Sequence, residues 1–363
     1  MKEHKLQRLT VLVVTVIYLV IVVGTIVGFD PADLPKPTFY DLMSGAWAQS
    51  YEEYLSEHLG FHDTLFRIKS QTDLFVGEKM VQGVYVTDDM LLEKLYSEDT
   101  PGPDALAEPV NRFYETAGVP TFMLLVPSAS EIYESLLPAN AVNAEQEQLI
   151  RDTYSETVNG VRCMDVYQAL SAAKNDYIYY RTDRHWTCCG AYVAYQNIIQ
   201  KMGFSAVPYQ RYVISHLSTE FRGDLYARTL YGGVRSDLLD HYIYERGSTV
   251  QSVTEYRADG TTAERGTIYD VSALRSEDMY RFYLGAPCPK LVIRTNVESG
   301  KRLLLYKDDF ADCMVPFLMQ HYSEICIVDL EQAKDDLLAA ADPSEYTQVL
   351  FLCSMQKWEA LWK

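Results

Sequence analysis

Short apolar runs alternate with amphipathic segments over most of this chain. Residues 121–126 (TFMLLV) form a continuous apolar run, typical of a strand buried on both faces, and residues 104–117 before it have helical periodicity that ends at Gly118. The rhythm returns near the carboxyl end, where the pattern predicts strands at 302–306, 324–330 and 347–353 and helices at 312–322 and 331–341. Such alternation predicts βαβ units, so we expect an α/β fold, a three-layer sandwich with a mainly parallel sheet.

The middle of the chain adds further elements and one interruption. The pattern predicts an amphipathic helix at 50–70, a hairpin at 83–92 turning at Asp88-Asp89, a helix at 145–159, short strands at 163–167 and 177–180, and a helix from an N-cap at Thr187 to Met202. Residues 204–285 break the rhythm with β-like pieces around the turn Ala258-Asp259-Gly260. We interpret this segment as a β-rich insertion or as a small β-rich subdomain.

The first 30 residues have the pattern of a membrane anchor. Residues 9–29 contain no charge, and about 20 apolar residues span a bilayer as a helix. Lys2, Lys5 and Arg8 precede the run and Asp30 follows it, which predicts a cytoplasmic N-terminus and an extracellular main domain at the cell membrane. A cleaved signal peptide is the alternative, but the apolar run is too long and no A-x-A-like site follows directly. We therefore expect an anchor at 1–29, a linker at 30–50 and an extracytoplasmic domain at 51–363.

Composition narrows the classes of function. The net charge of the chain is −18, and so acidic a surface repels phosphate backbones, which excludes nucleic acid as a partner. Seven cysteines occur without a CxxC pair, and several lie in apolar runs, as core residues do. The sequence allows one disulfide but does not identify the two cysteines that would form it.

Two predicted strand ends carry chemically active residues. Asp183 and His185 follow the first, and an Asp-x-His step there can orient the imidazole as a general base, with Trp186 as a wall. The alternative is a helix-entry turn with a structural histidine. The second strand end is followed by three acids, Asp308, Asp309 and Asp312. The alternative to a functional site is an N-cap cluster, since acids favour a helix N-terminus, with Asp312 as the cap.

Together these segments resemble the DHHW family of bacterial envelope proteins, which is similar to the alginate O-acetylation proteins among the SGNH hydrolases. The family's Asp-His-His-Trp-Thr corresponds to residues 183–187 (DRHWT), and its later block, roughly Lys-Asp-Ser-Tyr-Ala followed by Pro-Phe-Leu, corresponds to residues 307–311 (KDDFA) and 316–318 (PFL). The resemblance implies an SGNH or flavodoxin-like sandwich and a role in O-acetylation or deacetylation of a cell-surface polysaccharide. A multi-span membrane acyltransferase is the partner that it suggests.

The chain departs from the family pattern at two positions. Arg184 replaces the first histidine of the hallmark, while His185 keeps the Asp-x-His spacing. Asp309 stands where the resemblance places the acyl-accepting serine. A carboxylate has no proton for His185 to remove, and acetyl transfer to it would give a labile anhydride. We therefore expect impaired catalysis, with Asp309 within about 6 Å of His185 and the imidazole held between two carboxylates.

Three functions remain open from the sequence. An active esterase or O-acetyltransferase would need another nucleophile, for which Ser128 and Ser130 after the 121–126 strand are candidates. A non-catalytic pseudoenzyme would bind a glycan or a partner, and we expect Arg184, Trp186, Asp308 and Ser128 to contribute to binding. A divalent metal bound by Asp183, His185 and the acids of residues 308–312 is the third; we expect neither a metal nor a cofactor.

Overall fold

The structure is a computed structural model that describes residues 11–16, 18–20, 22–24, 61–95, 100–333 and 336–362. It forms two compact units, Met1–Glu78 with Thr229–Tyr231 and Lys79–Arg228 with Gly232–Lys363. The predicted boundary between linker and main domain at residue 51 lies outside the described residues.

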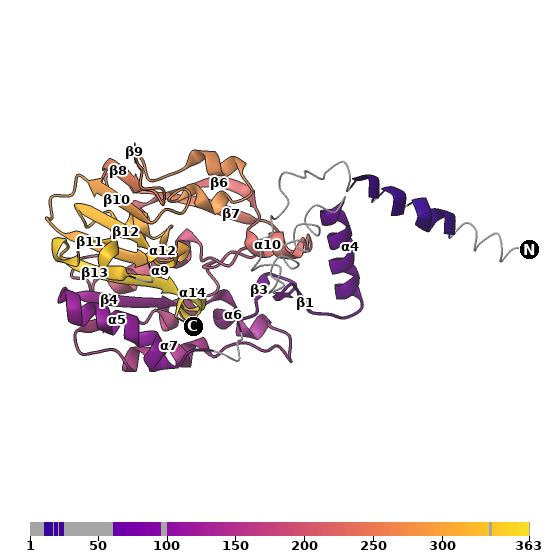
Figure 1. The fold of residues 1–363 in the computed structure, drawn as a ribbon, viewed down its shortest axis with the longest axis horizontal. Coiled ribbons are helices and arrows are strands. Elements are labelled where there is room, and N and C mark those ends of the chain that lie inside the picture. Colours follow the sequence, from indigo (N-terminus) through magenta and orange to yellow (C-terminus); the bar gives the residue numbers. More distant parts are fainter. Residues whose placement is uncertain are drawn as a thin grey trace, which may run out of the picture. The chain divides into compact units, whose positions relative to one another are not determined.

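The larger unit is built on one eight-stranded sheet with the order β5-β4-β13-β11-β12-β10-β8-β9. Figure 1 shows the strands from β4 to β9 in this order from bottom to top. The first five strands pair in parallel and the last three antiparallel. The bounds in sheet order are Val161–Cys163, Thr121–Val126, Gln348–Ser354, Arg302–Lys307, Glu324–Asp329, Lys290–Thr295, Val250–Tyr256 and Thr262–Arg265. The sheet is therefore mostly parallel, as the alternation of apolar runs predicts.

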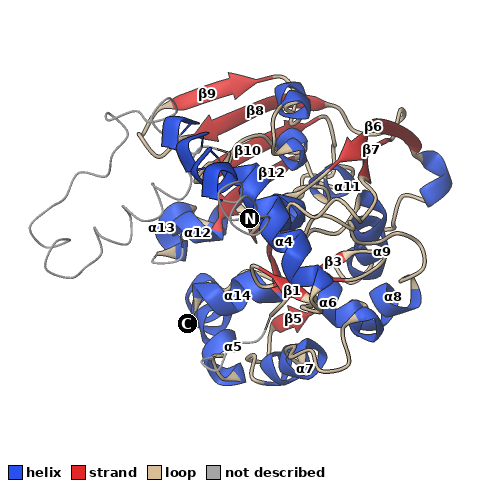
Figure 2. Cartoon of the chain, turned by 90° about the vertical axis from the view of Figure 1, so that its right-hand side faces the viewer, coloured by secondary structure: helices blue, strands red, loops and turns tan. Residues whose placement is uncertain are grey.

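Helices cover both faces of this sheet (Figure 2). Successive residues of β4 and β11 enter two different apolar cores, because side chains of a strand point alternately to its two faces. One core contains α5 (Pro103–Ala117) and α14 (Met355–Leu361), and the other contains α9 (Cys188–Ile199) and α11 (Val315–Leu318). The remaining helices of the unit are α6 (Ala129–Ile132), α7 (Gln146–Ser155), α8 (Tyr167–Ala172), α10 (Asp224–Thr229), α12 (Leu330–Ala333) and α13 (Leu337–Ala340).

Several local predictions match the structure. Gly118 ends α5 in the left-handed conformation, and the Thr187 hydroxyl caps α9 by accepting from the Gly190 amide. The predicted hairpin corresponds to β2 (Val84–Val86) and β3 (Leu91–Glu93), preceded by β1 (Met80–Val81). The segment 204–285 contains two kinds of strand: β8 and β9 widen the main sheet, while β6 (Val213–Phe221) and β7 (Asp237–Ile243) form a separate pair.

The strand predicted at 177–180 is wrong. This segment pairs with no strand of the main sheet, and Tyr179 forms only an isolated bridge with Trp186. The reason is that the backbone pairs with its own continuation, since the Tyr180 amide donates to the His185 carbonyl and the Thr187 amide to the Ile178 carbonyl. The Asp183–His185 segment is thus a tight fold-back that leads into α9.

The helices predicted at 312–322 and 331–341 are also much shorter than expected. The first ends at Leu318, because the backbone continues there in tight i to i+3 turns.

The smaller unit contains α4 (His62–Phe75). Residues 11–16, 18–20 and 22–24 are helical, and the rest of the predicted 9–29 span and the 30–50 linker lie outside the described residues. Among the residues that are described, no helix has both the length and the apolar character that crossing a membrane requires.

Candidate active site

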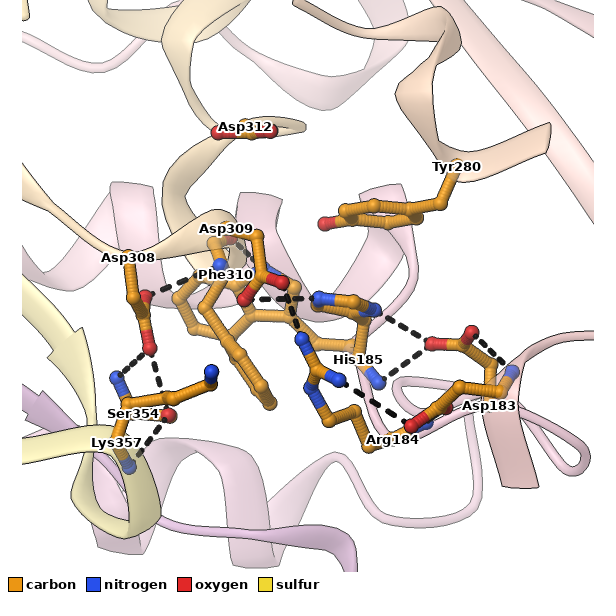
Figure 3. Close-up of polar contacts among 12 residues, drawn as sticks. Asp183, Arg184, His185, Tyr280, Asp308, Asp309, Phe310, Asp312, Ser354 and Lys357 are labelled. Carbon is orange, nitrogen blue, oxygen red and sulfur yellow. Dashed lines mark hydrogen bonds and ion pairs between the residues drawn. The ribbon is translucent and has the colours of Figure 1, made fainter. Parts of the chain in front are cut away.

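The Asp183–His185 segment and the turn after β11 meet at one edge of the sheet (Figure 3). Asp309 begins a 3₁₀ turn, Asp309–Ala311, directly after the carboxyl end of β11. His185 Nδ1 lies 2.6 Å from Asp183 Oδ1, and His185 Nε2 lies 3.2 Å from Asp309 Oδ1. The second pair is close enough for an ion pair, although the two atoms do not align as a hydrogen bond. The Asp309 carboxylate is thus within the predicted 6 Å, on the side of the imidazole opposite Asp183.

Arg184 joins the same group of charges. Its guanidinium forms an ion pair with Asp309 Oδ2 and lies 3.2 Å from Asp224 Oδ2, on α10. The carboxylate of Asp224 also accepts the Arg184 amide, and the Asp224 amide donates to Asp183 Oδ2 at 3.2 Å. Arg184 and Asp309, the two residues that differ from the sequence pattern noted above, therefore contact one another.

Aromatic rings enclose the imidazole. The Tyr280 ring stacks on His185 with centroids 3.9 Å apart and planes 8° apart, and Phe310 lies 5.0 Å away. Trp186 is completely buried, and its indole N–H donates to the Phe310 carbonyl at 2.6 Å. This hydrogen bond therefore links the His185 segment to the turn that carries Asp309. No sequence signal singled out Tyr280, because it lies 95 positions after His185 in the irregular segment.

Charge and burial set the protonation of the group. Burial opposes protonation of His185, but the carboxylates of Asp183 and Asp309 outweigh it and raise the pKa of His185 to about 10. Burial likewise opposes ionisation of Asp309, yet His185 and Arg184 hold the pKa of Asp309 well below its usual range. At neutral pH the imidazole is a cation between two anions, and a protonated imidazole cannot act as a general base.

Nuclear magnetic resonance of ¹⁵N-histidine-labelled protein should show this directly. We expect His185 to stay protonated beyond pH 8, while His321 stays neutral down to about pH 5, since burial lowers the pKa of His321 to about 4. Because the folded pKa of His185 exceeds its ordinary value of 6.5, its contribution to stability is complete below that pH and is lost as pH rises toward 10. Titration of His185 near pH 6.5 would contradict the charge arrangement.

A family model described as DHHW protein matches residues 76–328. The chain belongs to the DHHW family. Among solved structures, a DHHW family protein from Eubacterium siraeum is 25% identical, with a TM-score of 0.63 over 77% of this chain and 93% of that one. PatB1 of Bacillus cereus, solved with a sulfonyl adduct, is 20% identical with a TM-score of 0.65 over 77% of this chain and 97% of that one. The O-acetyltransferase domain of Pseudomonas putida AlgJ follows at 15% identity and a TM-score of 0.45. No curated protein matches.

The acids on either side of Asp309, in the turn after β11, have structural partners. Asp308 is buried and caps the 3₁₀ turn, and it accepts from the amide and hydroxyl of Ser354 at 2.8 and 2.7 Å, which links β11 to β13. The prediction that Asp312 caps a helix is wrong, because its carboxylate forms a buried ion pair with Lys307 instead. Within the described part of the chain, no three His, Cys, Asp or Glu side chains are grouped so as to hold a metal ion.

The two candidate substitute nucleophiles lie beyond β4. The Ser128 hydroxyl caps α6 by accepting from the Glu131 amide and lies 3.0 Å from the Ser130 hydroxyl. Among the described side chains, neither hydroxyl has a hydrogen bond to His185. The structure therefore brings Asp183, Arg184, His185 and Asp309 together and leaves Ser128 apart. All seven cysteines are free.

Proposed function

We propose that this DHHW protein is a membrane-anchored, extracytoplasmic binder of an O-acetylated envelope glycan, with a hydrolase-type site that has lost its nucleophile. One observation carries the loss of catalysis. The Arg184–Asp309 ion pair stands where the family pattern has a histidine and a serine, and Asp309 faces the nitrogen of His185 that would take the serine proton.

The chemistry of acyl transfer supports this proposal. A serine hydroxyl attacks the acetyl carbon while histidine accepts its proton, and the alcohol of the glycan leaves with that proton. The Asp309 carboxylate has no proton to give. His185 cannot accept one either, because the two neighbouring carboxylates keep its imidazole protonated. The Asp183–His185 pair is otherwise intact, so the site keeps its shape without the reacting group.

The glycan and the location rest on the sequence. The motif blocks at 183–187 and 307–318 resemble proteins of polysaccharide O-acetylation, which favours an acetylated cell-surface polymer as the ligand and a multi-span acyltransferase as a partner. The uncharged run at 9–29, with basic residues before it, favours an anchor with the main domain outside the cell.

Binding and turnover can be separated with one polymer. Purified full-length protein in detergent is mixed with O-acetylated xylan or with the same xylan after alkaline removal of its acetyl groups. We expect preferential binding to the acetylated polymer and no release of acetate above that of a His185→Ala variant. Equal binding to both polymers would argue against an acetyl-directed site.

A further inference from the structure

A groove of about 450 Å³ lies beside the fold-back that carries Asp183. Its walls come from the segment after β4, from the fold-back and from the loop before β7. Three basic side chains and three tyrosines line it: Lys174, Arg181, Arg235, Tyr133, Tyr177 and Tyr179. We call this groove the basic groove.

The basic groove opposes the charge of the molecule as a whole. Lys174, Arg181 and Arg235 line it against one lining carboxylate, Asp89, whereas the chain carries a net charge of −18. Lys174 and Arg235 are exposed, and among the described side chains neither has an ion-pair partner. Two cationic side chains are thus available to an anion in the groove.

Arg181 is held in a fixed orientation. Its guanidinium lies over the Tyr177 ring, 4.2 Å from the centroid, and 3.5 Å from the buried carboxylate of Asp237. Tyr177 adopts the left-handed conformation with φ 55°, which is unfavourable for a tyrosine, and its hydroxyl donates to Asp237 Oδ1 at 2.6 Å, which holds it there. The Tyr177 ring and the Arg181 cation thus lie on the same wall of the groove, which the Tyr133 and Tyr179 rings, packed edge to face with centroids 6.2 Å apart, also line.

The basic groove and the candidate active site are built on neighbouring parts of the fold. Arg181 precedes Asp183 by two residues, and Tyr133 follows β4 by way of α6. In the sheet, β13 alone separates β4 from β11, whose end carries Asp309. Since neighbouring strands lie about 4.8 Å apart, the two ends are about 10 Å apart, a span that one polymer chain can cover along the sheet edge.

We infer that the basic groove binds an anionic segment of a glycan polymer, through carboxylate or phosphodiester groups paired with Lys174, Arg181 and Arg235. Tyrosine faces supply the apolar contact that sugar rings require. This inference rests on the proposed function only in placing the neighbouring sugar units at His185; binding of the anionic segment itself stands apart from the fate of any acetyl group.

Isothermal titration of the full-length protein in detergent with three defined oligomers tests the inference. The probes are hexagalacturonate, a poly(glycerol phosphate) of equal charge and neutral cellohexaose. We expect one or both anionic probes to bind more tightly than cellohexaose, with an affinity that falls as salt is added. The difference between the first two distinguishes carboxylate from phosphodiester as the source of charge.

The variant Lys174→Gln/Arg235→Gln should weaken binding of the preferred anion at least about tenfold, the loss expected for one charge-assisted hydrogen bond. Arg275→Gln, an exposed arginine outside the groove, is the matched control and should change nothing. Equal binding of neutral and anionic probes, no binding of any probe, or equal affinities for the double variant and the control would overturn the inference. Preference for acetylated over deacetylated xylan tests the proposed function alone, because both polymers have the same backbone charge.

Discussion

The Asp309→Ser variant is expected to hydrolyse acetyl esters at least about 100-fold faster than the wild-type protein, the lower end of what a positioned general base contributes. The substitution places a hydroxyl on the turn that faces His185 Nε2, where the present carboxylate oxygen lies 3.2 Å from that nitrogen. It also removes one of the two anions that raise the pKa of His185, so that the imidazole becomes available as a base near neutral pH.

Asp309→Ala is the control for this gain, because it removes the anion without adding a nucleophile and should stay inactive. The double variant Arg184→His/Asp309→Ser restores both positions of the family pattern and should be at least as active as the single one. Phenylmethylsulfonyl fluoride gives an independent readout. The serine oxygen displaces fluoride from sulfur, and intact mass should rise by one sulfonyl group only in variants that carry the new serine.

Activity of Asp309→Ala equal to that of Asp309→Ser would show that a different nucleophile operates. Stability should change little in either variant. The Asp309 side chain is 37% exposed, and ion pairs in such positions contribute about 1 kcal/mol or less.

Asp237→Ala should lower the free energy of unfolding by about 3–5 kcal/mol. The Asp237 carboxylate is completely buried at the start of β7 and accepts from the Tyr177 hydroxyl, the amides of Arg181 and Thr182 and the Thr182 hydroxyl. Alanine would leave these donors without an acceptor inside the protein, and each unsatisfied buried donor costs about 1–3 kcal/mol. Urea unfolding measures the change.

Asp259→Ala is the matched control, since Asp259 also accepts from an amide and a hydroxyl, both of Thr261, but in the exposed turn between β8 and β9. It should have little effect. If the two variants were equally stable, Asp237 would not be what holds the fold-back.

The elements that local sequence chemistry determines were predictable. A continuous apolar run gave β4, Gly118 ended α5 and Thr187 capped α9. The pattern at 177–180 misled because Tyr179 and Tyr180 are as buried as residues of a central strand. Their burial comes from aromatic packing, of Tyr179 on Tyr133 and of Tyr180 on Phe221, and the distant carboxylate of Asp237 holds the flanking residues. Periodicity reports neither contribution.

The site divides in the same way. The Asp-x-His spacing predicts the short contact of Asp183 with His185, because two residues in one turn share a local geometry. The contact of Arg184 with Asp309 joins positions 125 residues apart, and only the fold brings them together. Considered alone, Arg184 leaves the Asp-x-His step unchanged; beside Asp309 it is half of an ion pair that occupies the reacting position.

Acetyl-ester hydrolysis by the full-length wild-type protein, with His185→Ala as the background, tests the central claim most directly. A His185 charged between two carboxylates with no serine opposite it predicts identical rates for the two proteins across pH 6 to 8. Turnover by the wild-type protein that His185→Ala abolishes would contradict the claim and would require a nucleophile elsewhere, with Ser128 the first to replace.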